Sequence, residues 1–157
     1  MVRCWIYLTY KRQISNVGND TFYMDTFINL RKVFNIGCER TKLSAECINT
    51  GRGLQVLLIG GTSPHIGAVV MALPRPSLKT KKINSSDSYV LTVPGHKDYI
   101  IATQMASDIA KILNIVTVVT VGIHSDNMIN KEIQEIIANS ISLTETICSE
   151  FNQGKIN

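Results

Sequence analysis

The spacing of apolar residues most constrains the fold of this chain, because the spacing changes its period along the sequence. From Lys97 to Leu113, and again from Asn130 to Phe151, apolar residues recur at helical intervals. Between these segments, Ile115 to Val121 is a β-branched run of the strand type. Four apolar runs before the first helix are also typical of strands: residues 37–48, 54–59, 66–73 and 88–93. The sequence therefore predicts the order β-β-β-β-α-β-α, an α+β fold in which two helices back a small, mostly antiparallel sheet.

The same pattern predicts the buried helix faces and two connections. Thr50-Gly51-Arg52-Gly53 is typical of a hairpin turn, whereas the prolines, lysines and serines of residues 74–88 predict a long connection. The helical residues expected to face the sheet are Ile101, Met105, Ile109, Ile112 and Leu113, then Ile133, Ile136, Ile137, Ile141 and Cys148.

Length and composition narrow the class of protein. The 157 residues fit one domain, and the four cysteines lie far apart without a Cys-x-x-Cys pair. The net charge of +4 comes from scattered lysines and arginines, which does not favour nucleic-acid binding. The apolar run near the N-terminus is too short for a signal peptide or a membrane span, so we expect a cytoplasmic protein without a membrane partner.

The first 23 residues do not follow the hydrophobic pattern. Two interpretations stay open: a poorly ordered N-terminal extension of residues 1–23, or a mis-assigned start upstream of Met24. In either case residues 24–157 form the single predicted domain.

The three histidines of the chain follow or precede predicted strands. If the second, third and fourth strands form an antiparallel meander, and a helical crossover leaves the fourth and fifth strands parallel, several strand ends meet at one edge of the sheet. His65 precedes the third strand, His96 follows the fourth and His124 follows the fifth. We therefore expect the three imidazoles to lie close together.

This edge has the features of an anion site. The helix that begins near Gly95-His96-Lys97 offers free N–H groups, the positive end of a helix dipole and the charge of Lys97. Glycines without Cβ atoms would let a planar ligand approach the backbone: Gly60, Gly61 and Gly67.

Plainer interpretations of the same residues stay open. Each histidine can be a hydrogen-bonded turn residue, Pro94-Gly95 can be an ordinary turn, and Asp126-Asn127 can cap the last helix. A zinc site made by the three histidines is a further alternative, but each lies on a separate loop and no i, i+4 pair exists, so we expect no metal.

Three motifs carry a resemblance to a known family. In order, they are GG-x-x-PHIG from Gly60, PGHK from Pro94 and GIH-x-DN from Gly122. Over about residues 37 to 148 the chain resembles the prenylated-flavin chaperone family, typified by the small D subunit of gallate and related hydroxyarylic acid decarboxylases. The resemblance implies a fold similar to that of proteasome assembly chaperones, commonly paired as a homodimer. It also implies a non-catalytic protein that binds FMN or prenylated FMN and helps to load it into a prenylated-FMN-dependent decarboxylase.

By motif match, the resemblance implies a cofactor site on three loops: Pro64, His65, Ile66 and Gly67, then Pro94, Gly95, His96 and Lys97, then His124, Asp126 and Asn127. On this hypothesis His96 and Lys97 hold the phosphate, and the ring system lies near His65. His124 and Asp126 would bind the isoalloxazine edge or the ribityl hydroxyls. The sequence departs from the expected pattern at Ser125, where an apolar residue would be typical.

Two other functions stay open. One is a small enzyme for a phosphorylated ligand, with His65 or His124 as general base, although no nucleophile or carboxylate dyad accompanies them. The other is an assembly factor without a ligand, which docks a partner through its sheet or its last helix. A predicted edge strand at residues 37–48 and apolar helices also favour a homodimer.

Overall fold

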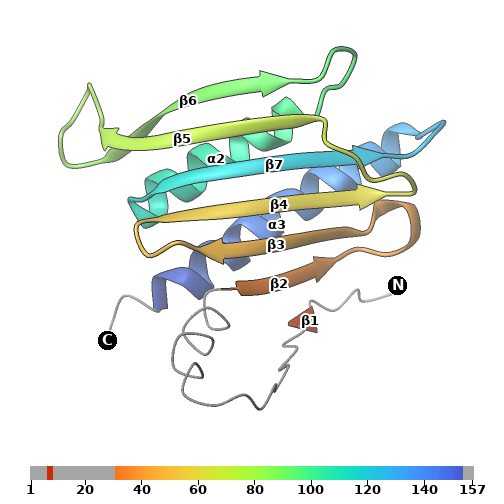
Figure 1. The fold of residues 1–157 in the computed structure, drawn as a ribbon, viewed down its shortest axis with the longest axis horizontal. Coiled ribbons are helices and arrows are strands. Elements are labelled where there is room, and N and C mark those ends of the chain that lie inside the picture. Colours follow the sequence, from red (N-terminus) through yellow and green to blue (C-terminus); the bar gives the residue numbers. More distant parts are fainter. Residues whose placement is uncertain (1–6, 9–30, 154–157) are drawn as a thin grey trace, which may run out of the picture.

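The structure, a computed structural model, describes residues 7–8 and 31–153 and contains a single mixed sheet with two helices (Figure 1). The elements, in chain order, are β1 (Tyr7–Leu8), β2 (Arg31–Ile36), the 3-10 helix η1 (Glu39–Thr41), β3 (Leu43–Asn49), β4 (Gly53–Gly61), β5 (Ala68–Pro76), β6 (Asn84–Thr92), α2 (Tyr99–Leu113), β7 (Val116–His124) and α3 (Asn130–Gln153). The strand order in the sheet is β1-β2-β3-β4-β7-β5-β6. The predicted α+β class is confirmed.

Strand β7 lies at the centre of the sheet. It pairs in parallel with β4 and antiparallel with β5, and the other neighbouring strands are antiparallel. The predicted meander of residues 54–59, 66–73 and 88–93 is therefore wrong, because β7 separates β4 from β5. A β-branched run that is apolar on both faces favours such a central position. The predicted strand directions hold, since β4, β6 and β7 all run opposite to β5.

The first strands of the domain differ from the prediction. The predicted strand of residues 37–48 begins at Leu43, and a further strand, β2, precedes it. Positive φ angles at Gly37 (78°) and Glu39 (47°) turn the chain between the two strands. Because β3 pairs with both β2 and β4, it is an interior strand and not the predicted edge.

The hairpins also show one confirmation and one correction. The predicted turn at Thr50–Gly53 forms, with the Thr50 N–H donating to the Gly53 carbonyl at 2.9 Å. The long connection predicted for residues 74–88 is shorter, because β5 continues to Pro76 and β6 begins at Asn84. Strand β7 pairs with β5 only as far as Ala72. Pro74 and Pro76 therefore lie beyond the segment of β5 that pairs with β7, where a residue without an N–H is tolerated.

Both helices lie on the same side of the sheet (Figure 1). Helix α2 packs its alanines 102, 106 and 110 together with Met105, Ile109 and Leu113 into the core. Helix α3 contributes Ile136, Leu143, Ile147 and Cys148. The expectation that four isoleucines face inward is wrong, because their apolar stripe is wider than the face that packs against the sheet; they are 37–55% exposed: Ile112, Ile133, Ile137 and Ile141.

The opposite face of the sheet has no described helix on it. Successive side chains of a strand point to opposite faces, so the residues that alternate with the buried ones point to this open face. Its apolar members, half-buried or exposed, are Val33, Ile48, Leu57, Ile59, Val69, Met71, Leu73, Tyr89, Leu91, Val116 and Val118. We call this surface the open sheet face.

Two further predictions concern the ends of the chain and the membrane. The predicted N-terminal extension, residues 1–23, lies outside the described residues except for β1, and so do residues 24–30. Within residues 31–153, neither helix combines the length and the apolar character that crossing a membrane requires.

Candidate functional site

The three histidines lie together at one end of the sheet. His65 is in the β4–β5 loop, His96 is in the β6–α2 loop and His124 is the last residue of β7. The ring centroids of His65 and His96 are 4.3 Å apart, and that of His124 lies 5.9 Å and 6.4 Å from them. This is the convergence that the strand directions predict, although the neighbours within the sheet differ. We call these side chains the histidine cluster.

A buried carboxylate lies beneath two of the histidines. Asp98 Oδ2 is 3.6 Å from both His65 Nε2 and His96 Nδ1, and these two nitrogens are 2.8 Å apart. The other carboxylate oxygen, Oδ1, accepts a hydrogen bond of 2.9 Å from the Ile123 N–H. The Asp98 side chain is only 6% exposed, against 24% and 33% for the two histidines. The sequence pattern does not single out Asp98 as a site residue; its position two residues after His96 in the same turn was the available signal.

Asp98 occupies the N-cap position of α2 without capping the helix through its side chain. An aspartate at this position usually accepts a hydrogen bond from the first turn. Here the carboxylate instead binds the end of β7 and lies against the histidines, so it joins the helix to the site.

Glycines allow the loops to approach one another. A Cβ atom at Gly122 would lie 1.6 Å from the His65 carbonyl oxygen, and one at Gly67 would lie 2.2 Å from Asp98 Oδ2. At Gly60 and Gly61 a Cβ would meet Leu43 and the His124 carbonyl. The space expected for a planar ligand at Gly60, Gly61 and Gly67 is therefore occupied by the protein, and these glycines serve the packing of the site loops.

An exposed rim surrounds the histidine cluster. Gly95 has a φ of 85° and turns the chain between β6 and His96. Lys97 is exposed beside His96, and α2 begins two residues later, at Tyr99. Ile66 is 63% exposed. The rim residues of the predicted site are Pro64, Ile66, Pro94, Gly95 and Lys97.

The loop after β7 is held from two sides. His124 Nε2 lies 3.1 Å from Asp126 Oδ1, and Asn127 has a φ of 52°. The Ser125 hydroxyl is buried and accepts a hydrogen bond of 2.9 Å from the Thr62 N–H, so it joins this loop to the β4–β5 loop. Ser125 therefore connects two loops by a buried hydrogen bond at a position where an apolar residue was expected.

A residue far away in sequence also contacts this loop. Arg40 donates to the Asp126 carbonyl at 2.6 Å, and its Nε lies 2.9 Å from Glu132 Oε1 in the first turn of α3. The Ile129 N–H donates to the Glu132 carboxylate at 3.0 Å. At the start of α3 this N–H is therefore bound by Glu132, and not by Asp126 or Asn127, the two residues considered as helix caps. No sequence signal pointed to Arg40, because its contact depends on the missed turn after β2.

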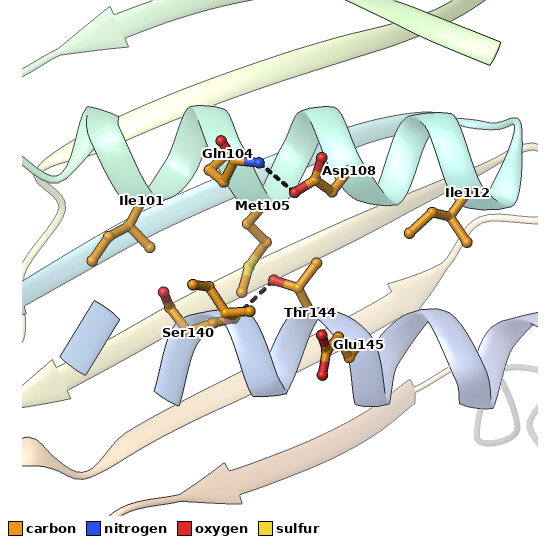
Figure 2. A pocket seen from close by; sticks show the side chains of 9 residues that line it. Ile101, Gln104, Met105, Asp108, Ile112, Ser140, Thr144 and Glu145 are labelled. Atoms are coloured by element: carbon orange, nitrogen blue, oxygen red, sulfur yellow. Dashed lines mark hydrogen bonds between the residues drawn. The ribbon is translucent and has the colours of Figure 1, made fainter. Parts of the chain in front are cut away.

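A separate hollow lies between the two helices (Figure 2). In it Gln104 donates to Asp108, and the Thr144 hydroxyl donates to the Ser140 carbonyl at 2.8 Å. Its lining combines apolar and polar side chains: Ile101, Gln104, Met105, Asp108, Ile112, Ser140, Ile141, Thr144 and Glu145. None of the predicted cofactor-site residues lines this hollow.

The family model of the prenylated flavin chaperone LpdD-like domain matches residues 37–152. No curated protein matches the chain. A chain from the crystal structure of a novel chaperone complex for yeast 20S proteasome assembly is similar, with 14% sequence identity and a TM-score of 0.48. That similarity covers 82% of this chain and 99% of the yeast one.

Proposed function

Since the chain belongs to the prenylated flavin chaperone family with an LpdD-like domain, we propose that it binds FMN or prenylated FMN at the histidine cluster and delivers it to a prenylated-FMN-dependent decarboxylase. The match spans the whole segment that holds the cluster, from before β3 to near the end of α3. Membership supports a role as a chaperone in flavin maturation. The identity of the flavin and of the receiving enzyme belongs to the proposal.

The observation that carries the proposal is the meeting of three imidazoles and an exposed lysine at one edge of the sheet. An FMN phosphate needs a cation and N–H donors, and Lys97 with His96 can supply both from the solvent side. The flavin ring would then lie over His65 and the exposed Ile66. His124 and Asp126, already paired with each other, would bind the ribityl hydroxyls or the ring edge.

The exposure of the rim supports delivery over catalysis. A carrier must release its ligand to a second protein, which requires that the ligand be reachable from outside. Lys97, Ile66 and Pro94 are exposed, and the histidines are half-buried and not enclosed. A small enzyme with His65 or His124 as general base is the rival, and turnover of a flavin phosphate would distinguish it.

A second copy of the chain is part of the proposal. The open sheet face carries apolar side chains from six strands, β2 to β7, and such a surface favours association. His124 follows Val118 and Thr120 at alternate positions of β7, so it lies at the end of the same face. A homodimer formed through this face would therefore border the cofactor site of each chain.

Transfer of the cofactor tests this function directly. The protein is loaded anaerobically with reduced prenylated FMN, freed from unbound flavin and mixed with a cofactor-free decarboxylase. We expect decarboxylase activity to appear faster than with the same concentration of free cofactor. Failure to retain FMN or prenylated FMN at micromolar concentrations would contradict the proposal and leave the ligand-free assembly factor. Chemical conversion of the flavin would favour the enzyme.

A further inference from the structure

His65, His96 and Asp98 are arranged as the ligands of a metal ion. We propose that they bind one divalent transition metal ion per chain, through His65 Nε2, His96 Nδ1 and Asp98 Oδ2. The site has two ligands in common with the predicted flavin site and a third, Asp98, that the flavin proposal does not use.

The distances between the three atoms fit a common centre. Transition metals bind imidazole nitrogen and carboxylate oxygen at about 2.0–2.2 Å, so two ligands of one ion lie about 2.9 Å apart at a right angle and about 3.4 Å apart at a tetrahedral angle. The three sides of the triangle here are 2.8, 3.6 and 3.6 Å. Shifts of a few tenths of an ångström would place all three atoms around one ion.

The type of ligand selects the ion. Two imidazoles and one carboxylate suit Zn²⁺ or Fe²⁺, and three protein ligands leave coordination positions open on such ions. Hard ions such as Ca²⁺ and Mg²⁺ prefer a shell of oxygen ligands. The open positions would face the exposed rim, because the buried carboxylate is on the inner side and the two histidines are partly exposed.

The surroundings of Asp98 support a cation at this point. A buried carboxylate is costly unless positive charge and hydrogen bonds compensate it. Within residues 31–153 the only ion-pair partners of Asp98 are these two histidines, and Lys97 is exposed. The Ile123 N–H fixes Oδ1 and leaves Oδ2 toward the imidazoles, as a hydrogen bond to the outer oxygen of a metal ligand would do. Gly67 leaves room for the carboxylate, since a Cβ there would overlap Oδ2.

The two histidines have an alternative arrangement without a metal ion. One imidazole donates a hydrogen bond to the other, so a single proton lies between His65 Nε2 and His96 Nδ1, which are 2.8 Å apart. The metal ion would replace this proton, and the two arrangements differ in whether the protein binds metal stoichiometrically.

The ion would also change what the cluster can bind, a step that rests on the proposed flavin function. A phosphate placed beside His96 lies close to the negative charge of Asp98, which repels it. A divalent ion between them reverses the sign of the local charge and offers a coordination position to a phosphate oxygen. We therefore expect the ion to increase FMN affinity more than riboflavin affinity.

Titration of untagged, chelator-treated protein with Co²⁺ tests the site, because tetrahedral or five-coordinate cobalt gives visible absorption. We expect one Co²⁺ per chain, and competition by Zn²⁺ and, without oxygen, by Fe²⁺ distinguishes the two natural ions. His65→Ala, His96→Ala and Asp98→Asn should each weaken binding by roughly a hundredfold or more, since removing even an outer-shell partner costs 10- to 100-fold. His124→Ala is the matched control, because its ring is about 6 Å from the others, and should keep the affinity.

Three results would overturn the metal site: no stoichiometric binding by the folded wild-type protein, unchanged affinity in Asp98→Asn, or an equal loss in His124→Ala. A variant that does not fold is replaced by a second measurement, the rise in melting temperature that Zn²⁺ gives the wild-type protein. No such rise would count against the site. FMN titrations with chelator and with metal separate the two proposals, since cobalt binding without any FMN binding leaves the metal site standing and rejects the flavin function.

Discussion

Lys97 is an exposed lysine beside the histidine cluster. If it binds the FMN phosphate, Lys97→Ala should weaken FMN binding more than riboflavin binding, because riboflavin has the same ring without the phosphate. A hydrogen bond to a charged group contributes about 1.5 to 3 kcal/mol, so the selective loss should be roughly tenfold to a hundredfold. Fluorescence titration with both ligands measures the two affinities.

A lysine at the other end of α2 provides the control. Lys111 is paired with Asp108 at 3.3 Å, and neither residue is part of the histidine cluster. Lys111→Ala should therefore leave both affinities unchanged. Equal losses of FMN and riboflavin in the Lys97 variant would show that this lysine does not bind the phosphate.

The buried thiols should make the protein less stable in alkali. Burial raises the pKa of Cys148 to about 11, and burial, with Glu46 nearby, raises that of Cys47 further. In the unfolded chain a thiol has a pKa of about 8.5. Above that pH the unfolded state loses protons that the folded state keeps, so the free energy of unfolding should fall between about pH 8.5 and 11.

Urea unfolding at pH 7 and at pH 9.5 measures this effect. The reference is the variant with both Cys47→Ala and Cys148→Ala, compared with its own stability at pH 7. Its loss at pH 9.5 should be smaller than that of the wild-type protein. Parallel losses in the two proteins would mean that other groups cause the alkaline destabilisation.

At the level of single residues, the sequence predicted the histidines but not their partner. The convergence of the three histidines follows from the strand directions, and these can be inferred from the order of strands and helices that hydrophobic periodicity indicates. Asp98 was missed, because a sequence pattern does not show that a residue at a helix start points back toward a strand. The glycines were identified as unusual, but the atoms that fill the space beside them come from other loops.

At the level of elements, the β4–β5 loop can pack closely against β7 because Gly122 has no side chain. Gly122→Ala would place a methyl group at the His65 carbonyl, which is backbone and cannot rotate away. Overpacking of this kind costs about 1 to 3 kcal/mol. We expect this loss in urea unfolding, together with weaker FMN and Co²⁺ binding as His65 is displaced.

Thr120→Ala, two residues earlier on the same face of β7, is the control for this change. Thr120 is half-buried, and the substitution removes atoms without adding any near His65. Stability and binding should change little. A Gly122→Ala protein with unchanged stability would show that the loop adapts and that close packing does not position His65.

The order and type of most elements could be predicted, but their pairing could not. Five of the six strands from β2 onward and both long helices were located from local periodicity, whereas β2 has no clean alternation and was missed. The central position of β7 depends on which strands it pairs with after the α2 crossover. Local periodicity does not indicate this pairing, because it depends on the arrangement of all the strands. The exposed isoleucines of α3 were misplaced for a related reason, since the helix packs on only part of its apolar stripe.

At the level of the whole molecule, the open sheet face is the apolar surface that we expect a second chain to cover. It joins Met71 on β5 to Val118 on β7, which are paired neighbours, and to Tyr89 on β6. Met71 and Tyr89 are 40% and 60% exposed. A second copy placed on this face by two-fold symmetry would bury these side chains twice, once in each chain.

Light scattering and analytical ultracentrifugation at micromolar concentration should show a dimer. Met71→Glu introduces a charge on the open sheet face, on the strand next to the central β7, and should give a monomer, because carboxylates from the two chains would be brought into one desolvated interface. The matched variant, Ile137→Glu, alters an isoleucine of similar exposure (37%) on α3, on the other side of the sheet. It should remain a dimer.

The two variants together decide which surface associates. A wild-type monomer would reject the homodimer outright, and a dimer that survives Met71→Glu but not Ile137→Glu would place the interface on the helices. If the open sheet face is the interface, the monomeric Met71→Glu protein should also bind FMN less tightly, since His124 lies at the end of that face and the second chain would border the site. Unchanged FMN affinity in the monomer would show that each chain holds its cofactor alone.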